Sequence, residues 1–299
     1  MELIPEIAAL RNRPFREIDP AQFRNAVWNI DYSGTGDPRR QLDLILPDGE
    51  GPWPVAVIIH GGGYCSTSRR AEYVASSFKF ASQGYAVAAV GYRLAPETPL
   101  PAQFHDVRMA VRYLAAHADE LHLDVSNFFL LGRSAGANIA AMAALPVVNE
   151  ILDGPAFVPS LEPLSVAGVI SLYGRFEFDI SQARLAGVIG DYVNDPEKLS
   201  FFTYLGTEYP PVLIQHGLGD KTIDWHQSQK AYDHITVRCK ESTAILELIP
   251  QAGHGDPAFS SDAHTIRCLE FMDRIRLHGD SVPRRAEDLP KIQLFGGEV

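Results

Sequence analysis

The sequence predicts an α/β protein with a mostly parallel central sheet and helices on both faces. Apolar runs of strand length alternate along the chain with longer segments of helical character, the order typical of parallel sheets. Several runs are apolar throughout, which indicates strands that are buried. The 299 residues, 46% of them hydrophobic, can bury one sizeable core, and we predict a single domain over residues 1–299.

The first predicted strand covers residues 42–46, where apolar and polar residues alternate as in an antiparallel strand at the sheet edge. Apolar runs at residues 55–59 and 85–90 predict the next two strands. A Pro-rich loop follows, and then a helix is expected from about residue 102 to residue 117.

Later strands are predicted at residues 127–131, 166–173, 211–215 and 244–249. Two segments do not fit this alternation, about residues 1–35 and the aromatic-rich residues 175–209. Insertions at the carboxyl edge of a parallel sheet lie beside its chemistry. We therefore predict that both segments form a small cap that lines the substrate pockets. The alternative is that the aromatic residues only pack the insertion onto the sheet.

A G-x-S-x-G pentapeptide at residues 132–136 is the most specific chemical signal in the chain. It stands between the apolar run at 127–131 and an Ala-rich segment with helical character, so it occupies a strand–turn–helix setting. A turn this sharp strains the serine backbone, and a Cβ at Gly132 or Gly136 would crowd the strand or the helix. This setting predicts Ser134 as a nucleophile.

Three consecutive glycines, Gly61 to Gly63, directly follow the strand predicted at residues 55–59. They allow the backbone to approach a ligand closely and leave N–H groups unshielded. Such donors suit an oxyanion, and the N–H of Ala135 would complete the hole.

A serine nucleophile needs a base, and the base needs a carboxylate that orients it. Asp220 and His254 each stand just past the end of a predicted strand, in the chain order Ser, Asp, His. The carboxyl ends of parallel strands share one edge of the sheet, so these residues can meet Ser134 there. We predict Ser134, Asp220 and His254 as the catalytic residues. The alternatives are Asp224 for the acid, and for the base the following histidines: His216, His226 and His264.

The motifs together resemble the hormone-sensitive-lipase-like carboxylesterases of the α/β-hydrolase fold, close to bacterial acetyl and feruloyl esterases. The shared motifs include His-Gly-Gly-Gly at 60–63, Tyr-Arg-Leu-Ala-Pro-Glu at 92–97, and the Gly-x-Ser-Ala-Gly turn. The resemblance spans about residues 40 to 275. It implies the same Ser-Asp-His triad, with an oxyanion hole formed by the N–H groups of Gly62, Gly63 and Ala135.

Within this resemblance, Arg133 departs from the acidic residue that usually precedes the nucleophile. We expect Arg133 to form a structural ion pair or to favour an anionic substrate group. Tyr64 and Tyr173 are, with Arg133, the candidate pocket residues. Arg93 and Glu97 are expected to hold their loop through an ion pair with each other.

The charge and the cysteine content of the chain argue against several classes of partner and cofactor. The net charge of −11 and the pI near 5.3 argue against nucleic acid or an anionic membrane surface as a partner. Three cysteines without paired spacing indicate reduced thiols and a cytoplasmic location, and no signal peptide is expected. No Cys/His cluster has zinc spacing, so neither a metal nor a cofactor is predicted.

The predicted function is that of a serine carboxylesterase acting on short-chain acyl esters, including acetylated or feruloylated sugars, through an acyl-enzyme. A small-molecule ester is the expected partner, and the sequence does not predict an oligomeric state. An amide hydrolase such as an arylformamidase is the first alternative. A non-catalytic small-molecule receptor is the second, although the three triad residues are all present.

Overall fold

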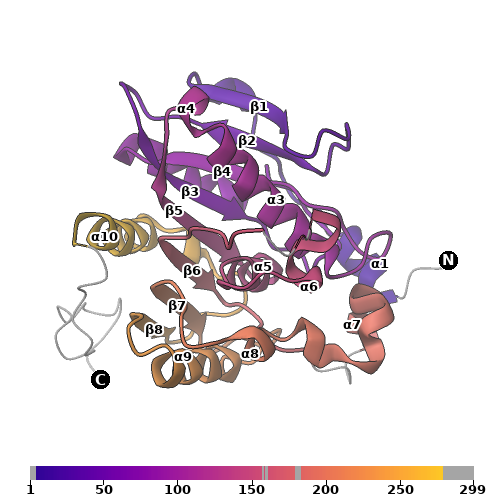
Figure 1. Ribbon diagram of the computed structural model, residues 1–299. Coiled ribbons are helices and arrows are strands. Elements are labelled where there is room, and N and C mark those ends of the chain that lie inside the picture. The colour runs from indigo at the N-terminus through magenta and orange to yellow at the C-terminus, as the bar shows by residue number, and fades with distance from the viewer. Residues whose placement is uncertain (1–4, 157, 159–160, 179–182, 279–299) are drawn as a thin grey trace.

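The computed structural model describes residues 5–156, 158, 161–178 and 183–278 (Figure 1). Within these ranges one sheet has the strand order β1-β2-β4-β3-β5-β6-β7-β8. The strands are β1 (Ala26–Asp31), β2 (Gln41–Ile45), β3 (Trp53–Ile59), β4 (Ala86–Val90), β5 (Leu123–Arg133), β6 (Gly168–Leu172), β7 (Val212–Gly217) and β8 (Ala244–Ile249). All neighbours pair in parallel except at one end, where β2 runs antiparallel to both β1 and β4.

The predicted strand at residues 42–46 is antiparallel, but its assignment to the sheet edge was wrong. β1 pairs with its outer side, from Ala26 opposite Ile45 to Asp31 opposite Gln41. Residues 26–31 thus belong to the sheet, and they fall within the N-terminal cap segment predicted for residues 1–35. β1 escaped prediction because it is a half-exposed strand of mixed polarity and not an apolar run.

Along the chain the helices alternate with the strands, and in space they cover both faces of the sheet (Figure 1). They are α1 (Pro5–Arg11), α2 (Glu72–Ala75), α3 (Ala102–Ala116), α4 (Ala118–Leu121), α5 (Ala135–Ala143), α6 (Glu150–Asp153), α7 (Ala183–Ile189), α8 (Phe201–Tyr204), α9 (His226–Arg238) and α10 (Asp262–His278). The helix predicted from about residue 102 to 117 is therefore present as α3. No helix in the described ranges is both long and apolar enough to cross a bilayer.

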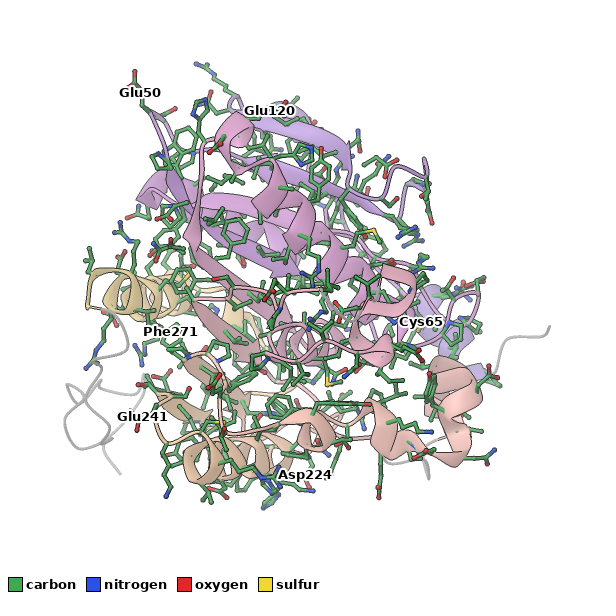
Figure 2. The ribbon with its side chains drawn as sticks, viewed as in Figure 1. Glu50, Cys65, Glu120, Asp224, Glu241 and Phe271 are labelled. Carbon is green, nitrogen blue, oxygen red and sulfur yellow. The ribbon has the colours of Figure 1, made fainter. Side chains whose placement is uncertain are left out.

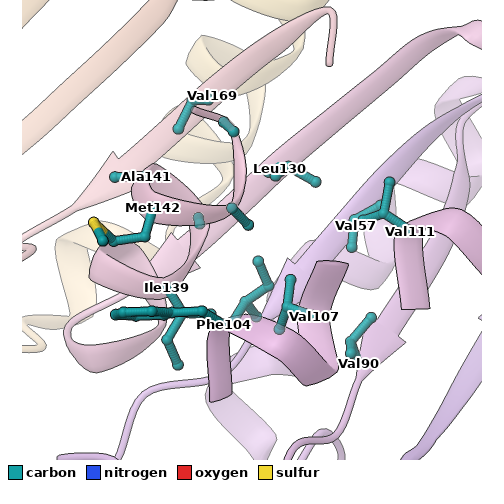
Figure 3. Close-up of a cluster of buried hydrophobic side chains, with 14 of the residues drawn as sticks. Val57, Val90, Phe104, Val107, Val111, Leu130, Ile139, Ala141, Met142 and Val169 are labelled. Carbon is teal, nitrogen blue, oxygen red and sulfur yellow. The ribbon is translucent and has the colours of Figure 1, made fainter. Parts of the chain in front are cut away.

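Two layers of buried side chains, one on each face, hold the helices to the sheet. On one face Val57 and Leu130 pack with Phe104 of α3 and Ile139 of α5 (Figure 3). The neighbouring residues along the same strands, such as Ile58, point to the other face and pack with α10. This alternation explains why the central strands are apolar throughout, because both faces of each strand are buried.

The parallel strands β3, β5, β7 and β8 all end at the same edge of the sheet. Consequently the glycine loop after β3, the turn after β5 and the loops after β7 and β8 are neighbours. α1 and α7 lie in contact with each other at one end of the molecule (Figure 1).

Candidate active site

Ser134 occupies the turn between β5 and α5 with a strained backbone, at φ +54° and ψ −119°. The flanking glycines are required by close packing, as the sequence predicts. An ideal Cβ on Gly132 would lie 2.1 Å from the carbonyl oxygen of Gly136, and one on Gly136 would lie 2.2 Å from that of Ile59. A side chain at either position would push the helix off the strand or off β3.

The structure brings the three predicted catalytic side chains together. The Oγ of Ser134 lies 2.8 Å from Nε2 of His254. On the other side of the ring, His254 Nδ1 donates to Asp220 Oδ2 at 2.7 Å. A carboxylate can only accept, so Nδ1 carries the proton and Nε2 is free to take one from the serine.

The side chain of Asp220 is fully buried, three positions past the end of β7. Its Oδ1 accepts from the backbone N–H groups of Thr222 at 2.8 Å and Ile223 at 3.0 Å. Burial by itself raises the pKa of Asp220, but hydrogen bonds from His216, from His254 and from the Ile223 N–H outweigh it, so the net pKa is lowered. The acid therefore stays ionised beside the imidazole.

His216 is a member of this network that the sequence did not predict as one. Its fully buried ring places Nε2 3.1 Å from Asp220 Oδ2 and 3.1 Å from the carbonyl oxygen of Ile223. Both neighbours are acceptors, so Nε2 carries the proton, and Nδ1 accepts from the hydroxyl of Ser228 at 2.7 Å. The spacing of four residues between His216 and Asp220 would indicate a contact only on a helix, and here it spans a strand end and a loop, so the sequence held no signal for it.

Asp224, His226 and His264 lie away from the serine. Asp224 pairs with His226 at 2.7 Å, and both side chains are about two-thirds exposed. Figure 2 shows Asp224 at the periphery of the molecule, beside α9. His264 of α10 is buried against Cys268 instead, 3.4 Å from its Sγ. Among the described residues, none of these three side chains is hydrogen-bonded to Ser134 or His254.

The glycine loop offers two N–H groups beside the serine. The N–H of Gly61 is taken by the hydroxyl of Tyr73 at 3.0 Å. Gly62 and Gly63 adopt φ values of +102° and +61°, and their N–H groups donate to no acceptor in the described part of the chain. Ala135 begins α5, so its N–H also lacks an acceptor within the helix.

A cavity of about 450 Å³ opens above Ser134 and His254. All three candidate pocket residues line it. The hydroxyl of Tyr64 donates to Asn138 at 3.0 Å, and the ring of Tyr173 packs edge-on to His254 with centroids 4.9 Å apart. Residues of both predicted cap segments also line the cavity: Ile7, Leu10, Arg13, Pro14, Phe15, Arg175 and Val188.

The expected ion pair of Arg133 is absent from the described residues. Its side chain is 2% exposed and donates to two neutral acceptors, the carbonyl oxygen of Phe259 at 2.5 Å and the hydroxyl of Ser76 at 3.0 Å. Arg133 thus connects the turn that carries Ser134 to the segment that follows His254. The reason for the error is that its partners belong to segments far away in sequence.

The prediction of an ion pair between Arg93 and Glu97 was wrong. Arg93 instead forms a two-pronged pair with the buried carboxylate of Asp106 in α3, at 2.8 and 2.7 Å. Glu97 pairs with Arg11 of α1, which also donates to the carbonyl oxygen of Cys65 at 3.2 Å. This pair fastens the N-terminal helix over the glycine loop.

No group of His, Cys, Asp and Glu side chains in the described ranges could hold a metal ion.

Comparison with known proteins finds a matching family model and relatives that are named as esterases. The BD-FAE family model matches residues 42–235, more than half of the chain. Esterase LipC of Mycobacterium tuberculosis is 27% identical over 264 residues, which cover 84% of this chain and 62% of that protein. Carboxylesterase 20 of Arabidopsis thaliana is 34% identical over 140 residues, which cover 44% of this chain and 41% of that protein. The chain therefore spans only about three-fifths of the length of LipC.

Solved structures share the fold. A truncated carbohydrate esterase from gut microbiota has a TM-score of 0.74 at 20% identity, covering 87% of this chain and 99% of that one. Esterase B of Lactobacillus rhamnosis, inhibited by a tributyrin phosphonate, has a TM-score of 0.72 at 23% identity. The match covers 87% of this chain and 90% of that one. The predicted resemblance and the predicted fold are both confirmed: the chain has the α/β-hydrolase fold and belongs to the BD-FAE family.

Proposed function

We propose that the chain is a serine carboxylesterase that uses Ser134, His254 and Asp220 in a two-step acyl transfer. The observation that carries this proposal is the unbroken line of hydrogen bonds from Ser134 Oγ through His254 to the buried Asp220, at 2.8 and 2.7 Å. Membership of the BD-FAE family supports it, as does the esterase named among the relatives.

In the proposed first step, the Ser134 hydroxyl attacks the ester carbonyl carbon while His254 Nε2 takes its proton. Asp220 holds the ring in the correct tautomer and stabilises the imidazolium that forms. The tetrahedral intermediate collapses, and the alcohol leaves with the proton from Nε2. Water then attacks the acyl-enzyme by the same route, which releases the acid and restores the serine.

The tetrahedral oxyanion would be held by the N–H groups of Gly62, Gly63 and Ala135. Their lack of acceptors within the described chain supports this role. Each such donor contributes about 3–4 kcal/mol to lowering the barrier in enzymes where one has been removed. Gly61 is left out of the proposed hole because its N–H is already bound to Tyr73.

We propose short acyl chains as substrates, because residues of both predicted cap segments line the cavity of about 450 Å³ and would limit the length of the acyl group. Leu10 of α1 and Val188 of α7 line the cavity from segments outside the sheet, and Phe15 lies at 42% exposure beside them. The cap would then set chain-length preference. A small-molecule ester in a cytoplasmic setting remains the proposed context, because the three cysteines are buried and form no disulfide with one another.

The test is hydrolysis of p-nitrophenyl esters from acetate to octanoate by the wild type and by Ser134→Ala. We expect turnover to peak at acetate or butyrate, and the variant to lose on the order of 10⁵- to 10⁶-fold in kcat, as other serine hydrolases do. Phe15→Ala should move the peak towards longer chains. No hydrolysis of any ester by the wild type would overturn the proposal. Labelling of Ser134 by an organophosphonate would then separate an amide hydrolase from a receptor.

A further inference from the structure

His254 lies in a loop that is loosely packed on both sides of the imidazole. A Cβ built on Gly253 or on Gly255 would meet no atom of the described chain within 4 Å, apart from its own neighbours in sequence. Upstream, the carbonyl oxygen of Ala252 accepts from the N–H of Gly219 at 2.9 Å, which ties this loop to the loop after β7. The position of the imidazole therefore also depends on what holds the chain downstream of it.

A hydrogen bond from Arg133 anchors the chain downstream of His254. The loop leads into the short 3₁₀-helix η6 (Pro257–Ser260). Within η6, Phe259 is fully buried, and its carbonyl oxygen accepts from Nη1 of Arg133 at 2.5 Å. A hydrogen bond from a charged donor is about twice as strong as one between neutral groups. This bond joins the segment after His254 to the end of β5, where Ser134 follows.

Arg133 gives this anchor a rigid support. It is the last residue of β5 and is in register with Leu172 of β6, inside the sheet. Arg133 is 2% exposed, and its Nη2 donates to the hydroxyl of Ser76 at 3.0 Å, so the guanidinium is held at a second point. Burial strengthens both hydrogen bonds because water does not compete for them. The spacing between the Ser134 turn and Phe259 is thereby fixed.

Ring contacts also connect Phe259 to the imidazole itself. The Phe259 ring lies 4.7 Å from the ring of Tyr173, and the Tyr173 ring lies 4.9 Å from that of His254, centroid to centroid. A shift of Phe259 would therefore move the backbone after His254 and would also disturb the ring that packs edge-on to the imidazole.

We propose that Arg133 is a positioning residue for the proposed general base. By holding Phe259, it keeps Nε2 of His254 at hydrogen-bonding distance from Ser134 Oγ, which is 2.8 Å in the structure. Proton transfer is sensitive to this spacing, since a displacement of about 1 Å can lower a rate by about 100-fold. Binding of the ester depends much less on where the imidazole lies, so Arg133 acts on kcat and not on KM. The inference rests on the proposed esterase function and adds a residue to its mechanism.

The test compares Arg133→Met and Arg133→Lys with the wild type on p-nitrophenyl butyrate. Each kcat is expressed per Ser134 that an organophosphonate labels at completion, so that unfolded molecules do not count. Methionine removes every donor, and kcat should fall by about 10- to 100-fold while KM changes less than about threefold. Lysine keeps a charged donor for the carbonyl oxygen of Phe259 and should recover part of the loss. A kcat for the lysine variant no higher than that of the methionine variant would overturn the inference.

Arg108→Met is the matched control. Arg108 is 1% exposed and its Nη1 donates to the carbonyl oxygens of Ala143 and Leu145, both at 3.2 Å, but it does not line the cavity. Its loss should lower the stability of the fold and leave kcat per labelled serine within about twofold of the wild type. Equal losses of kcat in Arg108→Met and Arg133→Met would overturn the inference, because removal of any buried arginine would then have the same effect.

The same assay separates failure of this inference from failure of the proposed function. An active wild type with an unimpaired Arg133→Met variant would overturn only the positioning role. A wild type that hydrolyses no ester would remove the esterase and the positioning role together.

Discussion

The loop after β7 carries two aspartates, Asp220 and Asp224, that each bond to a histidine and differ in their surroundings. Asp220 is fully buried, and its Oδ2 accepts from His254 at 2.7 Å and from His216 at 3.1 Å. Asp224 meets only His226, also at 2.7 Å, with both side chains about two-thirds exposed. Contact distance therefore does not distinguish the two pairs. Burial and the number of donors do.

The unequal burial of Asp220 and Asp224 shows what a carboxylate needs in order to orient a histidine ring. An exposed pair exchanges its partner for water at little cost, so it fixes no ring orientation. A buried carboxylate with one oxygen held by two imidazoles and the other by two backbone N–H groups has no comparable freedom. The contrast between the pairs suggests experiments in which matched substitutions should have unequal effects.

The largest difference in kcat is expected between the variants Asp220→Asn and Asp224→Asn. An asparagine in place of Asp220 would favour the wrong tautomer of His254, and kcat should fall by about 10⁴-fold, as in serine proteases with the same change. Asp224→Asn should leave kcat within about twofold. Steady-state kinetics on p-nitrophenyl butyrate measure both. Comparable losses in the two variants would show that the buried pair has no special role.

The next largest difference in kcat is expected between variants of the buried His216 and the exposed His226. His216→Leu removes one charge-assisted hydrogen bond to Asp220, and kcat should fall about 10- to 100-fold with KM unchanged. His216→Gln retains an N–H donor and should recover part of the loss. His226→Gln is the exposed control, for which no change is expected. If leucine and glutamine at position 216 behaved alike, His216 would be a packing residue only.

The smallest expected effect concerns His264, a buried imidazole with no carboxylate partner among the described residues. Burial, assisted by the charge of Arg133, lowers its pKa from 6.5 to about 3. In the unfolded chain His264 gains a proton as the pH falls below 6.5, whereas in the folded chain it does not. It should therefore cost about 2 kcal/mol of stability between pH 7 and pH 5.

His264→Gln should remove this part of the acid sensitivity. Urea unfolding at pH 7 and pH 5 measures the change in unfolding free energy for each protein. The wild type should lose more between the two pH values than the variant does. A pH dependence that is unchanged by the substitution would mean that His264 is protonated in the folded state.

Local patterns predicted the parts of the site that are local in the fold. Ser134 could be located because the glycines of its turn, the preceding strand and the following helix are adjacent in sequence. Asp220 and His254 could be placed beside it because parallel strands end at one edge. The role of His216 could not be predicted, since its contact with Asp220 depends on how the loop after β7 folds back.

Errors arose where partners come from distant segments. Arg93 reaches Asp106 in α3, and Glu97 reaches Arg11, 86 residues earlier in the chain. Choosing the nearest opposite charge in sequence gave the wrong pair for both. β1 was missed because a half-exposed edge strand has no apolar run to reveal it.

The contact between Gly136 and β3 joins the nucleophile turn to the glycine loop as one rigid piece. With no room for even a methyl group between Gly136 and the backbone of Ile59 and His60, neither part can shift without the other. The serine and the proposed oxyanion donors must then keep their spacing while neighbouring loops adapt. New substrate ranges would then have to evolve through α1 and the segment around α7, whose residues line the cavity without belonging to this piece.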